Sequence, residues 1–74
     1  MVAPPLVSGR ECAAALGRLG YSVVRQRGSH ARLECEGRPP LTVPMHDEID
    51  RGTLRSILRI VGITVEEFVA LRDG

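Results

Sequence analysis

The chain has 74 residues, of which 43% are hydrophobic and 26% are charged, and its formal net charge is +1. This length and composition exclude a disordered segment and a multidomain protein, and they predict one small globular domain. We expect a tail over residues 1–7 and a single domain over residues 8–74. No apolar run is long enough to span a membrane and no signal peptide is evident, so we expect a cytoplasmic protein without a membrane partner.

Aromatic and basic residues constrain the kind of partner. One tyrosine, one phenylalanine and no tryptophan are too few for a sheet that binds RNA by stacking several bases on aromatic rings. All ten basic residues are arginine. A GC-rich coding sequence explains this bias without any function, although arginine also binds phosphate through a planar, bidentate fork that lysine lacks.

The first predicted element is a capped helix over residues 9–19. Ser8 and Glu11 have the spacing of a capping box, in which the Ser8 side chain accepts from a backbone amide and Glu11 reaches back to the Ser8 amide. Gly20 follows as the expected C-terminal cap. The apolar stripe at helical spacing is Cys12, Leu16 and Leu19.

Three strands are predicted next. The first covers Tyr21 to Arg27, and the second covers His30 to Glu36 with an apolar residue at every second position. We expect a turn over residues 37–40, because it contains glycine and two prolines. A short third strand, Leu41 to Val43, ends at Pro44.

The C-terminal part is predicted to be helical. Asp50 caps the second helix, Gly62 ends it, and Thr64 and Glu67 form a capping box that opens a third. The element order α-β-β-β-α-α predicts an α+β fold in which a three-stranded antiparallel sheet is covered by helices on one face. The other face of the sheet is then open to solvent.

A candidate site lies at the hairpin between the first two strands. Gly28-Ser29 suits a two-residue type II′ turn, which fixes the register of the flanking strands. Arginines that face one another across a hairpin are unfavourable unless an anion neutralises them. The alternative without a functional role is that the arginines are solvated and the histidine is an ordinary turn residue. The side chains placed on one face by this register are Arg25, Arg27, His30 and Arg32.

A second basic feature lies on the second helix. Arg51, Arg55 and Arg59 are spaced four residues apart and form a ridge beside the apolar stripe. No acidic residue of the helix lies four positions from any of them, so no ion pair within the helix neutralises the ridge. The ridge suits a phosphate backbone, and the alternative is a solvated helix face.

The remaining histidine and the two cysteines carry weaker signals. His46 is either a second acid–base group or a surface histidine of the loop before the second helix. The acidic residues that follow it are explained by their favourable interaction with the positive, N-terminal end of that helix. Cys12 and Cys35 lack the spacing of a zinc site, and we expect both to be buried free thiols. We therefore expect no metal and no cofactor.

Several motifs occur in a characteristic order after the capped first helix. They are Arg25-Gln26-Arg27-Gly28-Ser29-His30, Leu41-Thr42-Val43-Pro44 followed by His46, Gly52-Thr53-Leu54-Arg55-Ser56-Ile57-Leu58, Gly62-Ile63-Thr64 and Glu66-Glu67-Phe68. Together these motifs resemble the HicA toxin family, from about Ser8 to Leu71. The chain departs from many members at Ala31, where a second histidine is frequent, and at Leu33, where an aromatic residue is frequent.

The resemblance implies a fold, an activity and a partner. HicA toxins are bacterial and archaeal mRNA interferases with a fold like that of double-stranded-RNA-binding domains, and each is neutralised by a HicB antitoxin. The histidine of the Gly-Ser-His motif is the family's catalytic residue, and it corresponds to His30. The implied activity is metal-independent cleavage of single-stranded mRNA by a histidine acting as general acid or base. The residues expected to bind RNA or phosphate are Arg25, Arg27, Gly28, Ser29, Arg32, Arg51, Arg55 and Arg59.

Two other classes of function fit the sequence. A non-catalytic RNA-binding module has the same arginines, because fold does not determine chemistry. A domain that binds only protein partners has no RNA role at all. His30 separates these alternatives, since a protein that only binds RNA needs positive charge but no imidazole.

Overall fold

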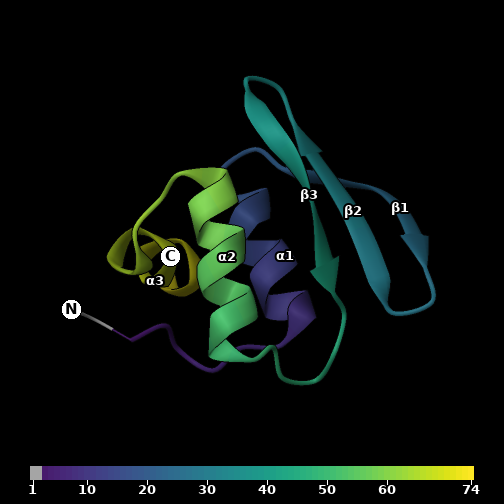
Figure 1. The fold of residues 1–74 in the computed structure, drawn as a ribbon. Coiled ribbons are helices and arrows are strands. Elements are labelled where there is room, and N and C mark those ends of the chain that lie inside the picture. Colours follow the sequence, from purple (N-terminus) through teal and green to yellow (C-terminus); the bar gives the residue numbers. More distant parts are fainter. Residues whose placement is uncertain (1–2) are drawn as a thin grey trace.

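The structure is a computed structural model that describes residues 3–74, so Met1 and Val2 of the predicted tail lie outside it. It confirms the predicted α+β order (Figure 1). The elements are α1 (Gly9–Gly17), β1 (Ser22–Arg27), β2 (His30–Cys35), β3 (Arg38–Pro44), α2 (Arg51–Val61) and α3 (Val65–Asp73). None of the helices in the described part of the chain is long and apolar enough to cross a bilayer.

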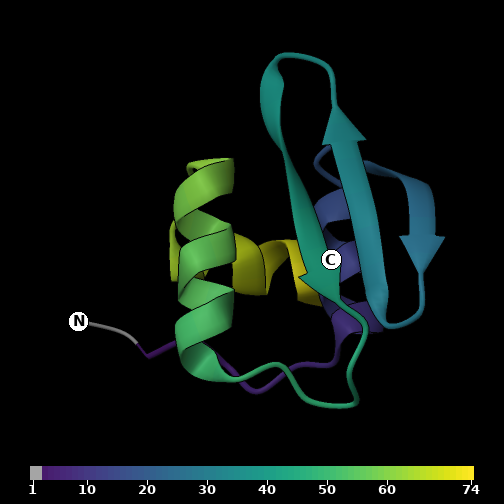
Figure 2. The ribbon, with the colours of Figure 1, turned by 45° about the vertical axis from the view of Figure 1, so that its right-hand side comes forward.

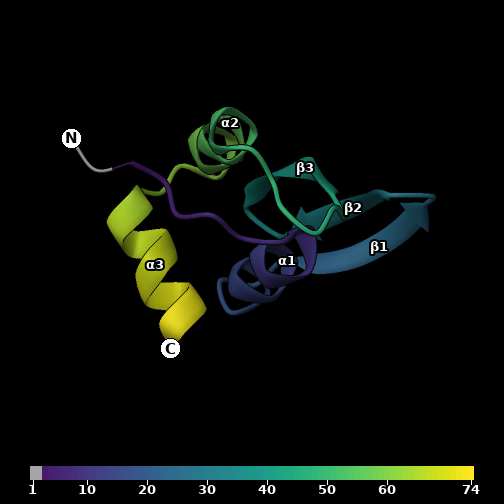
Figure 3. The ribbon, with the colours of Figure 1, turned by 90° about the horizontal axis from the view of Figure 1, so that it is seen from below.

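The sheet is antiparallel, in the order β1-β2-β3, and only one of its faces is buried. The side chains of that face belong to the same core as α1 and α2, while α3 lies farther from the sheet (Figures 2 and 3). Within residues 3–74 the opposite face carries no helix, as predicted (Figure 3). The core residues that β2 and β3 contribute, each at most 3% exposed, are Ala31, Leu33, Leu41 and Val43.

Strand β1 lies outside this packing. All six of its residues are exposed, and Val23 and Val24 are about half exposed at 50% and 52%. β1 pairs only with β2, and its register shifts between Val23 and Arg25. The first strand of the hairpin is therefore held by backbone pairing rather than by a helix over it.

The helix N-termini have the predicted caps. The Ser8 Oγ accepts from the Glu11 amide at 3.0 Å and the Glu11 carboxylate accepts from the Ser8 amide at 2.9 Å, and Thr64 and Glu67 form the same box. Asp50 accepts from the hydroxyl and the amide of Thr53, and these hydrogen bonds hold the pKa of Asp50 below its ordinary value.

The C-terminus of α1 differs from the prediction. The helix ends at Gly17 rather than at residue 19, and Arg18, not Gly20, is its C-cap. Three successive amides, those of Arg18, Leu19 and Gly20, each donate to a carbonyl three residues earlier. The chain therefore forms a turn of 3₁₀ type before it continues to β1. Gly20 lies in that turn with φ of +118°.

The third strand is longer than predicted. β3 begins at Arg38, so the expected turn over residues 37–40 is wrong and the chain reverses over Glu36 and Gly37 alone. β3 is an edge strand that pairs only with β2, and an edge tolerates prolines because one side of it needs no amide donors. Tyr21 precedes β1 instead of belonging to it, and its hydroxyl donates to the Pro39 carbonyl at 2.8 Å.

The two cysteines are both free, but they are not equally buried. Cys12 is 0% exposed, and burial raises the pKa of its thiol to about 12. Cys35 is only half-buried at the end of β2, which corrects the expectation that both thiols lie in the core.

We therefore expect thiol reagents to distinguish the two cysteines. A thiol must be ionised to react, so at pH 8 the native protein should be labelled at Cys35 and remain unlabelled at Cys12 on the same timescale. Mass spectrometry of labelled peptides measures both sites at once. Labelling in denaturant is the control and should modify both, whereas equal labelling of the native protein would contradict the packing of α1.

Candidate functional site

The hairpin between β1 and β2 has the predicted register. Gly28 adopts φ of +56° and Ser29 does not have a positive φ, as in a type II′ turn. Arg27 pairs with His30 and Arg25 pairs with Arg32 across the strands. The turn chemistry therefore places the histidine next to the arginines of the open face.

These four side chains line one shallow hollow of about 130 Å³. Thr42 of β3, which pairs with Arg32, completes the lining. Arg25, Arg27 and His30 are exposed, and Arg32 is half-buried. The lining contains cations, an imidazole and a hydroxyl, but no carboxylate. Thr42 was missed from the sequence, although the register of β3 against β2 identifies it.

The arginines of this hollow have no protein partners in residues 3–74. None of the guanidinium groups of Arg25, Arg27 and Arg32 donates a hydrogen bond or forms an ion pair there. By contrast, Arg18 and Arg38 donate to backbone carbonyls. The hairpin is therefore an arrangement of positive charge that an external anion can neutralise.

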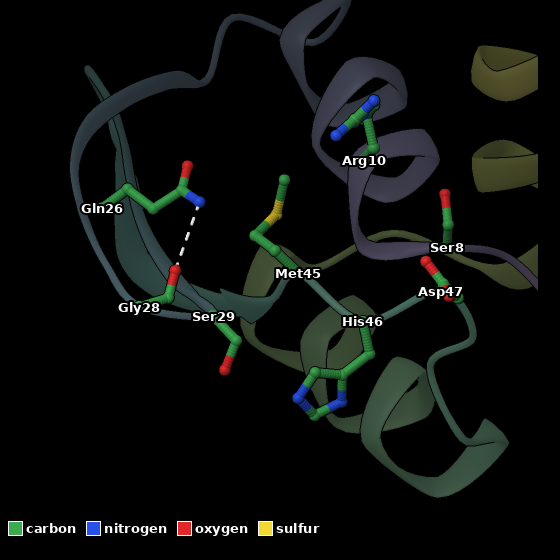
Figure 4. A pocket seen from close by; sticks show the side chains of 8 residues that line it. All are labelled: Ser8, Arg10, Gln26, Gly28, Ser29, Met45, His46 and Asp47. Carbon is green, nitrogen blue, oxygen red and sulfur yellow. Dashed lines mark hydrogen bonds between the residues drawn. The ribbon is translucent and has the colours of Figure 1, made fainter.

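A second, larger hollow of about 500 Å³ lies on the other side of the hairpin tip (Figure 4). Gln26 faces this hollow, while Arg25 and Arg27 face the first, because side chains alternate along β1. His46 also lines it, so His30 and His46 do not share a hollow. The residues that line the second hollow are Ser8, Arg10, Gln26, Gly28, Ser29, Met45, His46 and Asp47.

Backbone contacts fix the loop that forms one wall of the second hollow. The Met45 amide donates to the Ser29 carbonyl at 2.5 Å, and the Gly9 amide donates to the His46 carbonyl at 2.9 Å. A Cβ atom at Gly9 would lie 2.2 Å from the Pro44 carbonyl oxygen, so only glycine allows this approach. The loop after β3 is thus held between the hairpin tip and the start of α1.

Comparison with known families identifies the chain. The model of the family described as the HicA toxin of bacterial toxin–antitoxin systems matches residues 9–63, which is most of the chain. The chain belongs to the HicA toxin family. No curated protein matches it. As the toxin of a toxin–antitoxin system, it has an antitoxin partner.

The arginine ridge of this HicA-family toxin lies apart from both hollows. Arg55 and Arg59 are exposed on α2 and make no hydrogen bond or ion pair within residues 3–74. Arg51 differs, because its Nε donates to the Pro4 carbonyl at 2.9 Å and so attaches the N-terminal segment to α2. Two of the three ridge arginines are therefore free for a ligand, and the third has a structural contact.

Other groups of this HicA-family toxin were missed or lie scattered. Arg10, Gln26 and Asp47 line the second hollow, and the sequence gives no signal for them because they come from three separate segments. No three His, Cys, Asp or Glu side chains in residues 3–74 lie together as a metal-binding group.

Proposed function

We propose that this toxin cleaves single-stranded mRNA without a metal ion and uses His30 as an acid–base group. The observation that carries the proposal is the exposed imidazole of His30 in a hollow with three arginines that form no ion pair within residues 3–74. A phosphodiester supplies the missing anion. Cleavage of a phosphodiester also requires proton transfers, and an imidazole suits them because imidazole groups exchange protons near neutral pH.

The reaction needs two proton transfers. The ribose 2′-oxygen loses its proton and attacks the adjacent phosphorus, and the bond from phosphorus to the 5′-oxygen breaks as that oxygen gains a proton. The products are a 2′,3′-cyclic phosphate and a 5′-hydroxyl. His30 takes the proton from the 2′-hydroxyl or gives one to the leaving oxygen, and either His46 or water completes the pair. His46 lines the other hollow, whereas His30 is exposed to solvent. Water is therefore favoured over His46 as the second acid–base group.

The surrounding groups bind the substrate. Arg25, Arg27 and Arg32 hold the phosphate and stabilise the charge that develops on its oxygens. The Gly28-Ser29 turn contacts the RNA backbone at the hairpin tip, and the exposed ridge arginines extend the contact to more distant phosphates. The required 2′-hydroxyl restricts the reaction to RNA.

Incubation of the purified protein with a single-stranded RNA and with the DNA of the same sequence tests the activity. The proposal predicts that the RNA is cut in the presence of excess EDTA and that the DNA is not. Binding of RNA without any strand cleavage would instead support the alternative of a non-catalytic RNA-binding module.

The ridge on α2 makes a separate prediction. Replacing both Arg55 and Arg59 by alanine should weaken RNA binding and lower the slope of log K against log salt by about 0.7 for each lost phosphate contact. Titrations at several salt concentrations measure this slope. Arg72→Ala is the matched control, because Arg72 already pairs with Asp73 at 2.9 Å and its loss should leave the slope unchanged. An unchanged slope in the double variant would make the ridge an ordinary solvated face.

The antitoxin is proposed to cover the open face of the sheet. An acidic surface over the hairpin would neutralise its arginines and exclude RNA at the same time. Arg27→Glu or Arg32→Glu should therefore weaken the complex with the antitoxin by roughly tenfold or more. Arg59→Glu makes the same charge change on the helical side and should leave that complex intact. If a binding assay showed that Arg59→Glu weakens the complex and that Arg27→Glu and Arg32→Glu do not, the antitoxin would bind the helical side instead.

A further inference from the structure

We propose that the second hollow, on the far side of the hairpin tip from His30, is a nucleobase subsite that prefers guanine. This inference rests on the proposed function, because it places the base beside the phosphate at which His30 acts as an acid–base group. It assigns a role to three groups that the proposed cleavage does not use: Arg10, Gln26 and Asp47.

The Gly28-Ser29 turn lies between the two hollows. Gly28 and Ser29 line the second hollow, and Arg27 and His30, which flank the turn, line the first. A single strand whose phosphate lies against His30 passes over this exposed two-residue turn. The neighbouring nucleotide is then placed at the second hollow, because Gly28 and Ser29 line that hollow.

The chemistry of the second hollow differs from that of the first. Asp47 carries a negative charge that repels phosphate, whereas the first hollow contains no carboxylate. The Nε2 of Gln26 donates to the Gly28 carbonyl at 3.4 Å, which leaves the amide oxygen and the second amide proton of Gln26 for a ligand (Figure 4). The lining also offers two hydroxyls and the side chain of the partly buried Met45. Mixed donors and acceptors beside one apolar side chain, Met45, suit a base, and the volume of about 500 Å³ is within the usual range for small-molecule sites.

Guanine matches this set better than the other bases. Its O6 and N7 atoms are adjacent acceptors for a guanidinium such as that of Arg10, and its N1 and N2 groups are adjacent donors for a carboxylate such as that of Asp47. The side chain of Met45 lies between Gln26 and Arg10 in Figure 4, where a sulfur atom can contact the ring of the base. Neither Arg10 nor Asp47 has an ion pair in residues 3–74, so both are free to bind.

The walls of the subsite are held in place before any ligand binds. The loop that carries Met45 and Asp47 is hydrogen-bonded to Ser29 on one side and to Gly9 on the other. The capping box of Ser8 fixes the start of α1, from which Arg10 projects. A subsite on such a fixed frame can discriminate bases, because the backbone that carries its side chains needs little ordering on binding.

Binding of short oligonucleotides tests the subsite without cleavage. The probes are uridine-rich 2′-O-methyl RNA 9-mers that differ only at the central base, and the protein is the full chain. The guanine probe should bind roughly tenfold more tightly than the other three, which is within the range that one bidentate base contact provides. Asp47→Ala and Arg10→Ala should abolish this preference, while Glu48→Ala, which changes the adjacent exposed acid outside the hollow, should retain it.

Two results would overturn the proposal. One is equal binding of the four probes by the unaltered protein, or a guanine preference that survives in both variants. The other is loss of antitoxin binding in Asp47→Ala and Arg10→Ala with RNA binding unchanged, because the hollow would then contact protein. Since the probes lack a free 2′-hydroxyl, their binding is independent of catalysis, and cleavage of unmodified RNA reports separately on the proposed function.

Discussion

Replacing His30 by alanine is expected to reduce RNA cleavage by roughly 10²–10⁴-fold, the range that positioned proton transfer contributes. The same substitution should leave the fold intact. His30 is exposed at the start of β2 and lines the hollow on the open face of the sheet rather than belonging to the core. Cleavage rates and thermal melts of the variant measure the two effects.

The control for this variant lies in the turn that follows the same strand. Glu36→Gln changes an exposed residue that lines neither hollow, so it should cleave RNA at a rate close to that of the unaltered protein. Two outcomes would remove His30 from the mechanism. One is an unchanged rate in His30→Ala, and the other is a large fall in its melting temperature that accounts for the lost activity.

Gly9→Ala and Gly17→Ala are expected to change stability in opposite directions, although both are in α1. At Gly9 the new Cβ would lie 2.2 Å from the Pro44 carbonyl oxygen and 2.6 Å from the Met45 Cα, so the backbone must move. Overpacking of this kind costs about 1–3 kcal/mol. At Gly17 the new Cβ meets nothing within 4 Å, and alanine should stabilise the helix by up to about 1 kcal/mol.

Urea denaturation of the two variants measures this difference. A core of this size supplies only about 3–5 kcal/mol of net stability, so the loss at Gly9 should shift the midpoint strongly. Gly9→Ala should also impair the base preference, because the displaced loop carries Met45 and Asp47. Similar midpoints for the two variants would show that the loop does not pack against α1 as described.

The features that could be predicted from the sequence are governed by local rules. The Gly28-Ser29 turn fixes the register of the hairpin, and the register places His30 next to the arginines. The capping boxes depend on residues only three positions apart, and both were confirmed. These local signals account for most of the fold and for the first hollow.

The features that were wrong or missed depend on distant contacts. The extension of β3 to Arg38 requires that β3 be an edge strand, which is a property of the whole sheet. The Nε of Arg51 donates to Pro4, 47 positions earlier, which no helical pattern reveals. The second hollow combines α1, the hairpin and the loop after β3, so neither its lining nor the separation of His46 from His30 could be read from spacing.

The ends of the cleavage products test the central proposal most directly. A defined RNA is incubated with the unaltered protein in EDTA, together with the same RNA carrying one 2′-deoxy nucleotide at the cleaved position. Attack by the 2′-oxygen predicts a 2′,3′-cyclic phosphate and a 5′-hydroxyl, and no cut at the deoxy position. Fragments with 5′-phosphate ends, or cleavage at the deoxy position, would contradict the mechanism assigned to His30.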